Sequence, residues 1–371
     1  MNKIICTLLA FTAFGFLSPA FALQGESIVF DPATGNYLIT YRATVKRVAG
    51  SKVNPTVFRQ ITFIPATKIN PTIKSNLKHE ENGIIHYGYS LISGRDSQQV
   101  IIGILIDPVS SVTTTLPDIH LNVPAESAAI DLTAIEKTTI DMLNAAKQFD
   151  TPHLWQATMT DSKGSTSFRI GWYYDSDIGG LTPGGKADFG FNSRDLPGII
   201  QARVDGFAPD SQEIPGEETL NANDGGFGQQ YTELVDKKNF VPRNVAVPTI
   251  VVPTPFDAAV LLDRIQTQMH TWIGMQLLDA TFSSQLDRYF QSAISAYRLN
   301  QPKVGKQHIE TLRKMLKKEH EDLGRDEEHE SEKSQEKNDD KKSAMIDRLA
   351  AQVLDFDLKY VLKRAGVDKD D

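Results

Sequence analysis

Two histidines and two glutamates in or beside the charged segment 325–342 could bind a divalent metal ion. They are His320, His329, Glu327 and Glu330, and imidazole nitrogens and carboxylate oxygens are common metal ligands. The alternative is a solvated loop. Residues 325–342 hold no large apolar side chain, so burial cannot offset their ordering entropy. The composition favours a mobile charged loop, with a weak metal site at these four residues as the rival hypothesis.

Other patterns for metal, cofactor or nucleophile chemistry are incomplete. No His-Glu pair extends to H-E-x-x-H, in which both imidazoles would share one helix face. Asp175, Asp177 and Asp188 surround a glycine-rich segment but lack the spacing of a helix–loop–helix calcium site. Neither a G-x-S-x-G elbow nor a phosphate-binding glycine loop occurs. We therefore expect no cofactor and identify no catalytic residue, although two carboxylates distant in sequence could still form a glycosidase pair.

Aromatic residues in the expected strands are candidates for a ligand-binding face. They are Trp155, Trp172, Tyr173 and Phe207, and such a face would suit a sugar. Aromatic residues in strands are more often part of the core. Because side chains alternate along a strand, Trp172 should lie on the face opposite Tyr173. The sequence leaves both interpretations open.

The elements that would position these residues are mainly short strands. Residues 26–106 hold β-branched and aromatic runs bounded by turn residues, and similar runs follow from residue 153 onward. Short strands joined by turns favour an antiparallel β-sandwich. Residues 131–148 have a helical period instead and predict one inserted amphipathic helix.

The second half of the chain changes character twice. Residues 209–256 are rich in proline, glycine and acidic residues, and proline disfavours regular helices and central strands, so we predict an extended linker. Residues 257–371 show apolar stripes at helical spacing and predict a small all-α bundle that contains the charged loop 325–342.

The N-terminus predicts export. Residues 1–22 combine Lys3, an apolar run and the motif Ala20-Phe21-Ala22, which is typical of a signal peptide cleaved after Ala22. We expect a secreted or periplasmic protein. The single cysteine, Cys6, would be removed with that segment, leaving no disulfide or thiolate site.

The charge balance limits the partners. A net charge of −8 disfavours binding to nucleic acid or to anionic lipid surfaces. No second apolar run reaches membrane-spanning length, so we expect no membrane span after cleavage.

Parts of residues 257–364 resemble the FIMAH-type helical modules found at the C-termini of secreted bacterial proteins. The matching segments are LLDRIQTQM, FSSQLDRYFQSAISAYRLNQ, KQHIETLRKMLKKE and MIDRLAAQVLDFDLKYVL. The chain departs from that pattern in the loop 325–342 and in GKQHIETLRK. The resemblance implies an accessory, non-catalytic role. The segment GLTPGGKADFGFNSRDLPG is similar to an element of uncharacterised exported β-sandwich domains.

Together these patterns predict a multidomain protein. A signal peptide (1–22) precedes an all-β sandwich of one or two modules (23–208), the linker (209–256) and the helical bundle (257–371). They favour a secreted or cell-envelope protein that is not an enzyme and that binds carbohydrate or another envelope protein, or serves a structural role. The alternative is an exported, polysaccharide-directed hydrolase with its site on the sandwich loops.

Overall fold

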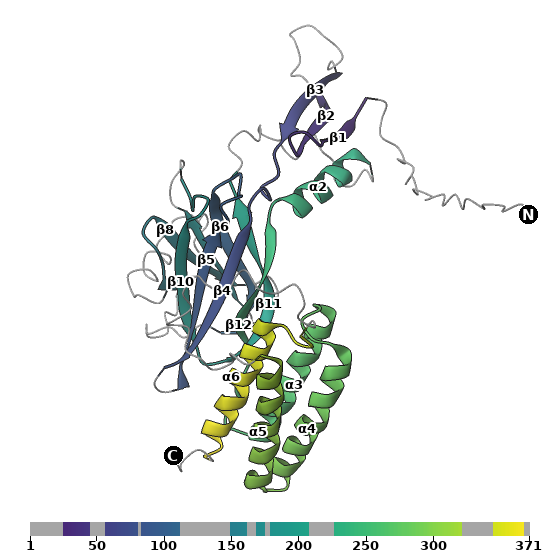
Figure 1. The fold of residues 1–371 in the computed structure, drawn as a ribbon. Helices are drawn as coiled ribbons and strands as arrows, with labels where there is room; N and C mark the ends of the chain where they lie inside the picture. The colour runs from purple at the N-terminus through teal and green to yellow at the C-terminus, as the bar shows by residue number, and fades with distance from the viewer. Residues whose placement is uncertain are drawn as a thin grey trace, which may run out of the picture. The chain divides into compact units, whose positions relative to one another are not determined.

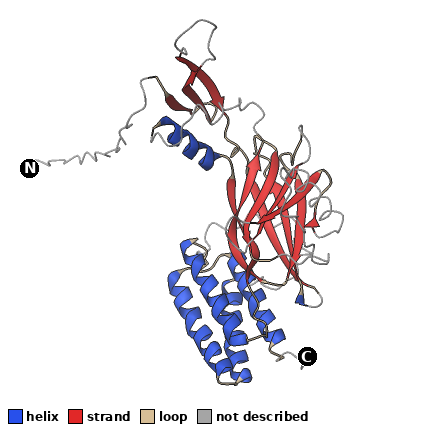
Figure 2. Cartoon of the chain, turned by 180° about the vertical axis from the view of Figure 1, so that it is seen from behind, coloured by secondary structure: helices blue, strands red, loops and turns tan. Residues whose placement is uncertain are grey.

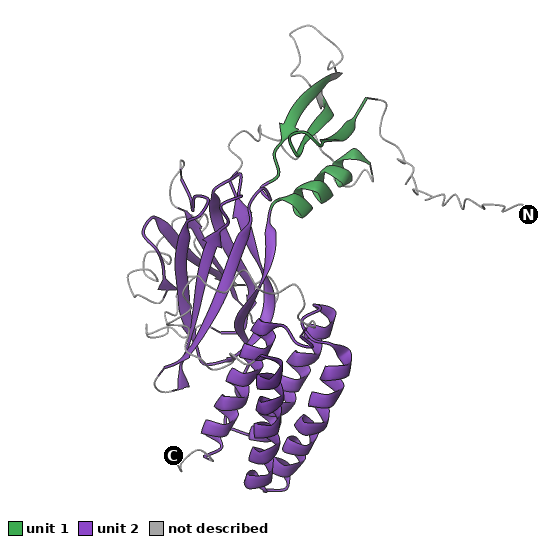
Figure 3. Ribbon diagram, in the orientation of Figure 1, with its two compact units in different colours: residues 1–65, 208–239 green, residues 66–207, 240–371 purple. Residues whose placement is uncertain are grey.

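A computed structural model describes most of the chain in two compact units. The described residues are 25–44, 56–80, 83–111, 149–161, 168–174, 179–207, 226–320 and 344–366. One unit combines residues 1–65 with 208–239, and the other combines 66–207 with 240–371 (Figure 3). The predicted signal peptide, the predicted helix 131–148 and the charged loop 325–342 lie outside the described residues.

The smaller unit is a three-stranded antiparallel sheet with one helix. β1 (Ser27–Asp31), β2 (Asn36–Thr44) and β3 (Thr56–Phe63) are neighbours in that order. Ile39 and Phe63 on one face of this sheet share a core with Phe227 and Tyr231 of α2 (Phe227–Lys238). Segments far apart in sequence therefore build one core.

The larger unit contains two further antiparallel sheets (Figure 1). The four-stranded sheet has the order β4 (Pro71–His79), β5 (Ile85–Ser93), β10 (Lys186–Ser193) and β7 (Phe149–Asp150). The five-stranded sheet has the order β12 (Val241–Ile250), β11 (Leu196–Gly206), β6 (Ile101–Val109), β9 (Phe168–Tyr174) and β8 (Trp155–Asp161). Antiparallel pairing, predicted from the short strands, is confirmed.

Side chains from these two sheets share one apolar core. Tyr89 of β5 lies 6.1 Å from Trp172 of β9, measured between ring centroids, and its hydroxyl donates a hydrogen bond of 2.8 Å to the Ala246 carbonyl of β12. Trp155 of β8 meets Phe189 of β10 edge-on, with the ring centroids 4.9 Å apart. Residues alternate between this core and the outer faces, as the period of two in each strand requires.

The prediction of an extended linker over residues 209–256 is wrong for most of its described part. Residues 227–238 form α2, and residues 241–250 form β12. β12 is an edge strand, where a residue without an N–H is tolerated. Pro242 and Pro248 therefore fit into a regular strand that pairs with β11.

Four helices follow, as the apolar period predicted (Figure 2). They are α3 (Ala258–Gly274), α4 (Ala280–Arg298), α5 (Pro302–Glu319) and α6 (Arg348–Arg364). Three of the helices have an aspartate N-cap that accepts hydrogen bonds from backbone N–H groups: Asp257 for α3, Asp279 for α4 and Asp347 for α6. α5 begins with Pro302 instead. None of the described helices combines the length and apolar character that crossing a membrane requires.

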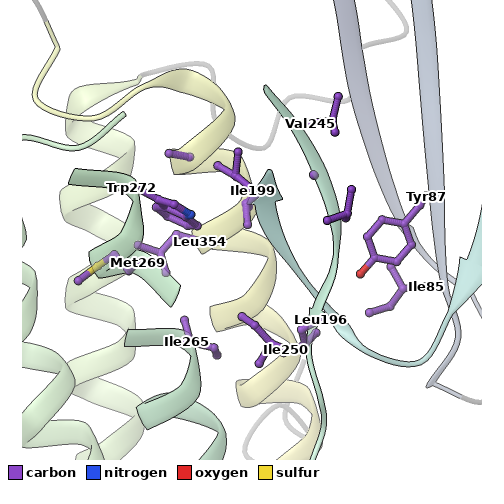
Figure 4. Packing of buried hydrophobic residues seen from close by; sticks show 14 of the residues in the cluster. Ile85, Tyr87, Leu196, Ile199, Val245, Ile250, Ile265, Met269, Trp272 and Leu354 are labelled. Carbon is purple, nitrogen blue, oxygen red and sulfur yellow. The ribbon is translucent and has the colours of Figure 1, made fainter. Parts of the chain in front are cut away.

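The helices and the sheets of this unit share one apolar core. Leu354 of α6 and Trp272 of α3 belong to the same apolar cluster as Ile199 of β11 and Val245 of β12 (Figure 4). The helices therefore cover an apolar part of the five-stranded sheet.

Candidate ligand-binding face

The outer face of the five-stranded sheet carries a row of residues that crosses four strands. Asp205 of β11 is paired with Gly103 of β6, which is paired with Tyr173 of β9, which in turn is paired with Gln156 of β8. Trp172, next to Tyr173 in the strand, is buried in the core, so these four residues lie on the opposite face. We call them the Tyr173 row. It spans three interstrand spacings, about 14 Å.

The Tyr173 ring lies over two glycines. A Cβ atom added to Gly103 would stand 3.0 Å from Cδ1 of Tyr173, and one added to Gly171 would stand 2.5 Å from Cε2. Glycine weakens the interior of a strand, and it commonly marks a place where another group approaches closely. Here the two glycines make room for the ring against the sheet. Tyr173 nevertheless keeps 37% of its surface exposed.

Asp205 provides a carboxyl group close to this ring. A Cβ atom on Gly103 would also lie 3.2 Å from Oδ2 of Asp205, so both side chains border the same glycine. Burial raises the pKa of Asp205 to about 6, although the charge of Arg203 opposes the shift. Burial and the nearby Asp205 carboxylate also raise the pKa of the Tyr173 hydroxyl. The carboxyl has no hydrogen bond or ion pair to any residue that the structure describes.

Both neighbouring arginines have other partners. Arg169 pairs with Asp107 at 2.7 Å, and the guanidinium of Arg203 lies 4.7 Å from the ring centre of Phe240. Partial burial with a perturbed carboxyl is a common property of functional sites. The face therefore combines an exposed ring, an unpaired carboxyl and the side-chain amide of Gln156, which suits an uncharged, polar ligand.

The structure separates the four aromatic residues that the sequence singled out. Trp155 and Trp172 are buried at 8% and 0% exposure and pack against Phe189 in the core, so they cannot form an open platform. Phe207 is half-buried directly after β11, where its backbone N–H bonds to the carbonyl of Val100. Tyr173 is the member of the set that lies on the outer sheet face.

The proposed metal ligands are not brought together in the described residues. Nε2 of His320 lies 2.8 Å from the carbonyl oxygen of Ile346, which links the end of α5 to the segment before α6. His329, Glu327 and Glu330 lie outside the described ranges. Within those ranges, no group of three or more histidine, aspartate or glutamate side chains could hold a metal ion.

Sequence reasoning missed that Asp205 and Tyr173 lie on either side of Gly103, and it missed a second polar cluster. On the outer face of the four-stranded sheet, Nδ1 of His86 lies 3.0 Å from Asn192 and Nε2 lies 3.3 Å from Asp150. The sequence held one local indication of the Tyr173 row, because Gly103 interrupts the apolar run QVIIGILI. Only the strand register, however, places Asp205 beside it.

No protein-family model, curated protein or solved structure matches this chain. The resemblance of residues 257–364 to FIMAH-type modules stays a prediction.

Proposed function

We propose that the protein is an exported, non-enzymatic binding protein that takes a carbohydrate on the Tyr173 row. In this proposal a β-sandwich presents the site, and the C-terminal helical bundle serves interaction or stability. The observation that carries the proposal is the Tyr173 ring, which lies over Gly103 and Gly171. Beside it is the carboxyl of Asp205, which has no hydrogen bond or ion pair within the described parts of the chain. Export is supported by the predicted signal peptide, residues 1–22.

A sugar suits this surface because it has both an apolar face and a rim of hydroxyl groups. The C–H face of a sugar ring can lie on an exposed aromatic ring, where it buries apolar area. Its hydroxyl groups can donate hydrogen bonds to a carboxylate, and bonds to a charged group are stronger than neutral ones. Asp205 and Gln156 flank the Tyr173 position within one row, so polar partners border the ring on two sides.

The alternative, a polysaccharide hydrolase, is less well supported on this face. Glycosidases usually need two carboxyl groups about 5 to 9.5 Å apart. Asp107, a second carboxylate on this face, is four residues beyond Gly103 on β6, or about 13 Å at the rise of a strand. It is also occupied by Arg169. The described residues of this face therefore favour binding over hydrolysis.

The test is retention of the mature chain on a panel of insoluble polysaccharides, including cellulose, chitin, xylan and peptidoglycan. We expect the wild type to be retained by at least one of them. Tyr173→Ala should weaken that binding about tenfold or more, since about 1.4 kcal/mol of lost contact corresponds to a factor of ten.

Two further variants distinguish two roles of Tyr173: stacking against the sugar, and covering the backbone at Gly103 and Gly171. Tyr173→Phe keeps the ring and should keep most of the binding. Tyr173→Leu still covers apolar backbone but lacks the ring, and it should bind as poorly as Tyr173→Ala. The proposal is wrong if Tyr173→Leu binds like the wild type, or if no polysaccharide retains the wild-type protein.

A further inference from the structure

The helices carry a second candidate site, a groove between α4 and α5. Its volume is about 760 Å³, within the range of about 300 to 1,000 Å³ typical of ligand pockets. Six residues at helical spacing on α4 and two on α5 line it: Thr281, Ser284, Gln285, Arg288, Tyr289, Ser292, His308 and Met315. We call this the α4–α5 groove.

The lining of the groove offers hydrogen-bond donors and two rings but no carboxylate. Arg288 has no ion pair with any residue in the described parts of the chain, so its five N–H donors are free for a ligand. The rings of Tyr289 and His308 face each other across the two helices, with centroids 6.3 Å apart and planes tilted by 46°. These groups could hold a planar or ring-shaped ligand that carries a negative charge.

The acidic residues of α4 and α5 are engaged elsewhere. Asp287, the single acid of α4, accepts a hydrogen bond from Gln266 and lies 2.8 Å from His270, both on α3. On α5, Glu310 pairs with Lys306, and Glu319 accepts the backbone N–H of Met345. No carboxylate of these two helices therefore neutralises Arg288.

α5, which forms one side of the groove, is basic although the protein is acidic. α5 carries six lysine and arginine residues against two glutamates, a balance of +4 that the pair of Arg313 with Asp355 of α6 reduces to +3, whereas the whole chain has a net charge of −8. Such a local excess of positive charge attracts anions. Guanidinium groups also match carboxylates and phosphates in a two-point geometry.

We infer that the α4–α5 groove binds an anionic sugar. Its carboxylate or phosphate would pair with Arg288, and its ring would lie against Tyr289 and His308. This site is separate from the Tyr173 row and does not depend on the function proposed for that row.

The test is isothermal titration calorimetry of the mature chain at low ionic strength. The probes are trigalacturonic acid as a carboxylated sugar, glucose 6-phosphate as a phosphorylated sugar, glucose as the neutral control, and inorganic phosphate. We expect binding of one or both charged sugars, with no heat from glucose and weaker binding of phosphate alone. The charged sugar that binds shows whether the groove prefers a carboxylate or a phosphate.

Two arginine variants on the same helix provide the matched comparison. Arg288→Ala should weaken binding of the charged sugar by about tenfold or more, because hydrogen bonds to charged groups are the stronger class. Arg298→Ala removes an exposed arginine of α4 outside the groove and should leave the affinity unchanged. Met315→Trp, which fills the groove, should also abolish binding, and melting curves would show that each variant is folded.

Several outcomes would overturn the inference. They are equal affinity for glucose, equal losses in Arg288→Ala and Arg298→Ala, and absence of binding by either charged sugar. Inorganic phosphate that binds as tightly as glucose 6-phosphate would contradict the role of the two rings. Binding that is lost in Tyr173→Ala but kept in Arg288→Ala would place the anionic sugar on the Tyr173 row instead.

Discussion

At the scale of single residues, the candidate face depends on two glycines, whose lack of a side chain makes room for the Tyr173 ring. Gly103 and Gly171 lack the Cβ atoms that would otherwise stand 2.5 to 3.0 Å from the ring atoms of Tyr173. Asp205 lies next to the same space and has a raised pKa. Both features can be tested by single substitutions.

Gly171→Ala should displace the Tyr173 ring and weaken ligand binding. Its Cβ would also lie 3.0 Å from Oγ1 of Thr158, so the new atom has little room. Gly274→Ala is the control, because no atom lies within 4 Å of its added Cβ, and it should stabilise α3 by about 0.5 to 1 kcal/mol. Thermal melting and polysaccharide retention measure both effects. Unchanged binding in Gly171→Ala would show that the ring position does not matter.

Asp205→Asn should stabilise the protein at pH 8 and have little effect at pH 4. The folded pKa of Asp205 is about 6, above the unfolded value of 3.8. The neutral carboxyl therefore contributes stability that is present below pH 3.8 and lost as the pH rises through 6. Melting temperatures of wild type and variant at the two pH values test this, with Asp263→Asn on α3 as an exposed control. A constant difference at both pH values would contradict it.

At the scale of elements, α6 holds two buried aspartates with opposite environments. Burial favours a raised pKa for Asp355, but hydrogen bonds from Arg313 and Lys359 outweigh it, and its pKa is lowered. Two residues later, Asp357 is 1% exposed, and neither of its oxygens has a hydrogen-bond partner among the residues that the structure describes. Burial raises the pKa of Asp357 well above its usual value. One carboxylate therefore stabilises the helix packing, and the other opposes it.

Asp357→Leu should raise the free energy of unfolding at pH 7 by roughly 1 to 3 kcal/mol, because it removes an unsatisfied buried polar group. The stability contributed by neutral Asp357 is present at acidic pH and is lost as the pH rises through its raised pKa. The advantage of the variant should therefore grow toward alkaline pH. Urea unfolding at several pH values would measure this.

Asp355→Leu is the matched change on the other side of α6. It leaves the half-buried Arg313 without its partner, and we expect a loss of roughly 1.5 to 3 kcal/mol, as for other hydrogen bonds to charged groups. Similar effects of the two substitutions would mean that the environments of the two aspartates are not as different as the structure indicates.

The local sequence predicted the elements better than their partners. Alternation identified strands such as β5, and the apolar period identified α3 to α6. β12 was missed because its prolines are tolerated only through its edge position, which is a property of the whole sheet. Asp205 and Tyr173 meet through the register of three strands, and no short segment of sequence contains that register.

At the scale of the whole molecule, each compact unit is built from two segments that are distant in sequence. In the larger unit, the helices after residue 257 bury apolar residues of β11 and β12, including Leu196, Ile199 and Ile250. A sheet domain and a helical domain joined by a free linker would not share such a core. The helices should therefore be required for the sheets to be stable.

A shortened chain that ends at Phe256 should fold poorly, because it exposes the apolar residues that α3 and α6 cover. We expect no cooperative thermal transition and increased binding of a hydrophobic dye. A cooperative melt close to that of the intact protein would show instead that the sheets form an independent domain.

The central claim is that a sugar lies on the ring of Tyr173. Saturation-transfer NMR tests it most directly, with a soluble oligosaccharide of whichever polysaccharide retains the protein. Irradiation of aromatic protons should transfer saturation to the sugar C–H protons in the wild type and in Tyr173→Phe, and the transfer should vanish in Tyr173→Leu. Transfer of equal strength in Tyr173→Leu would place the sugar elsewhere and contradict the proposed site.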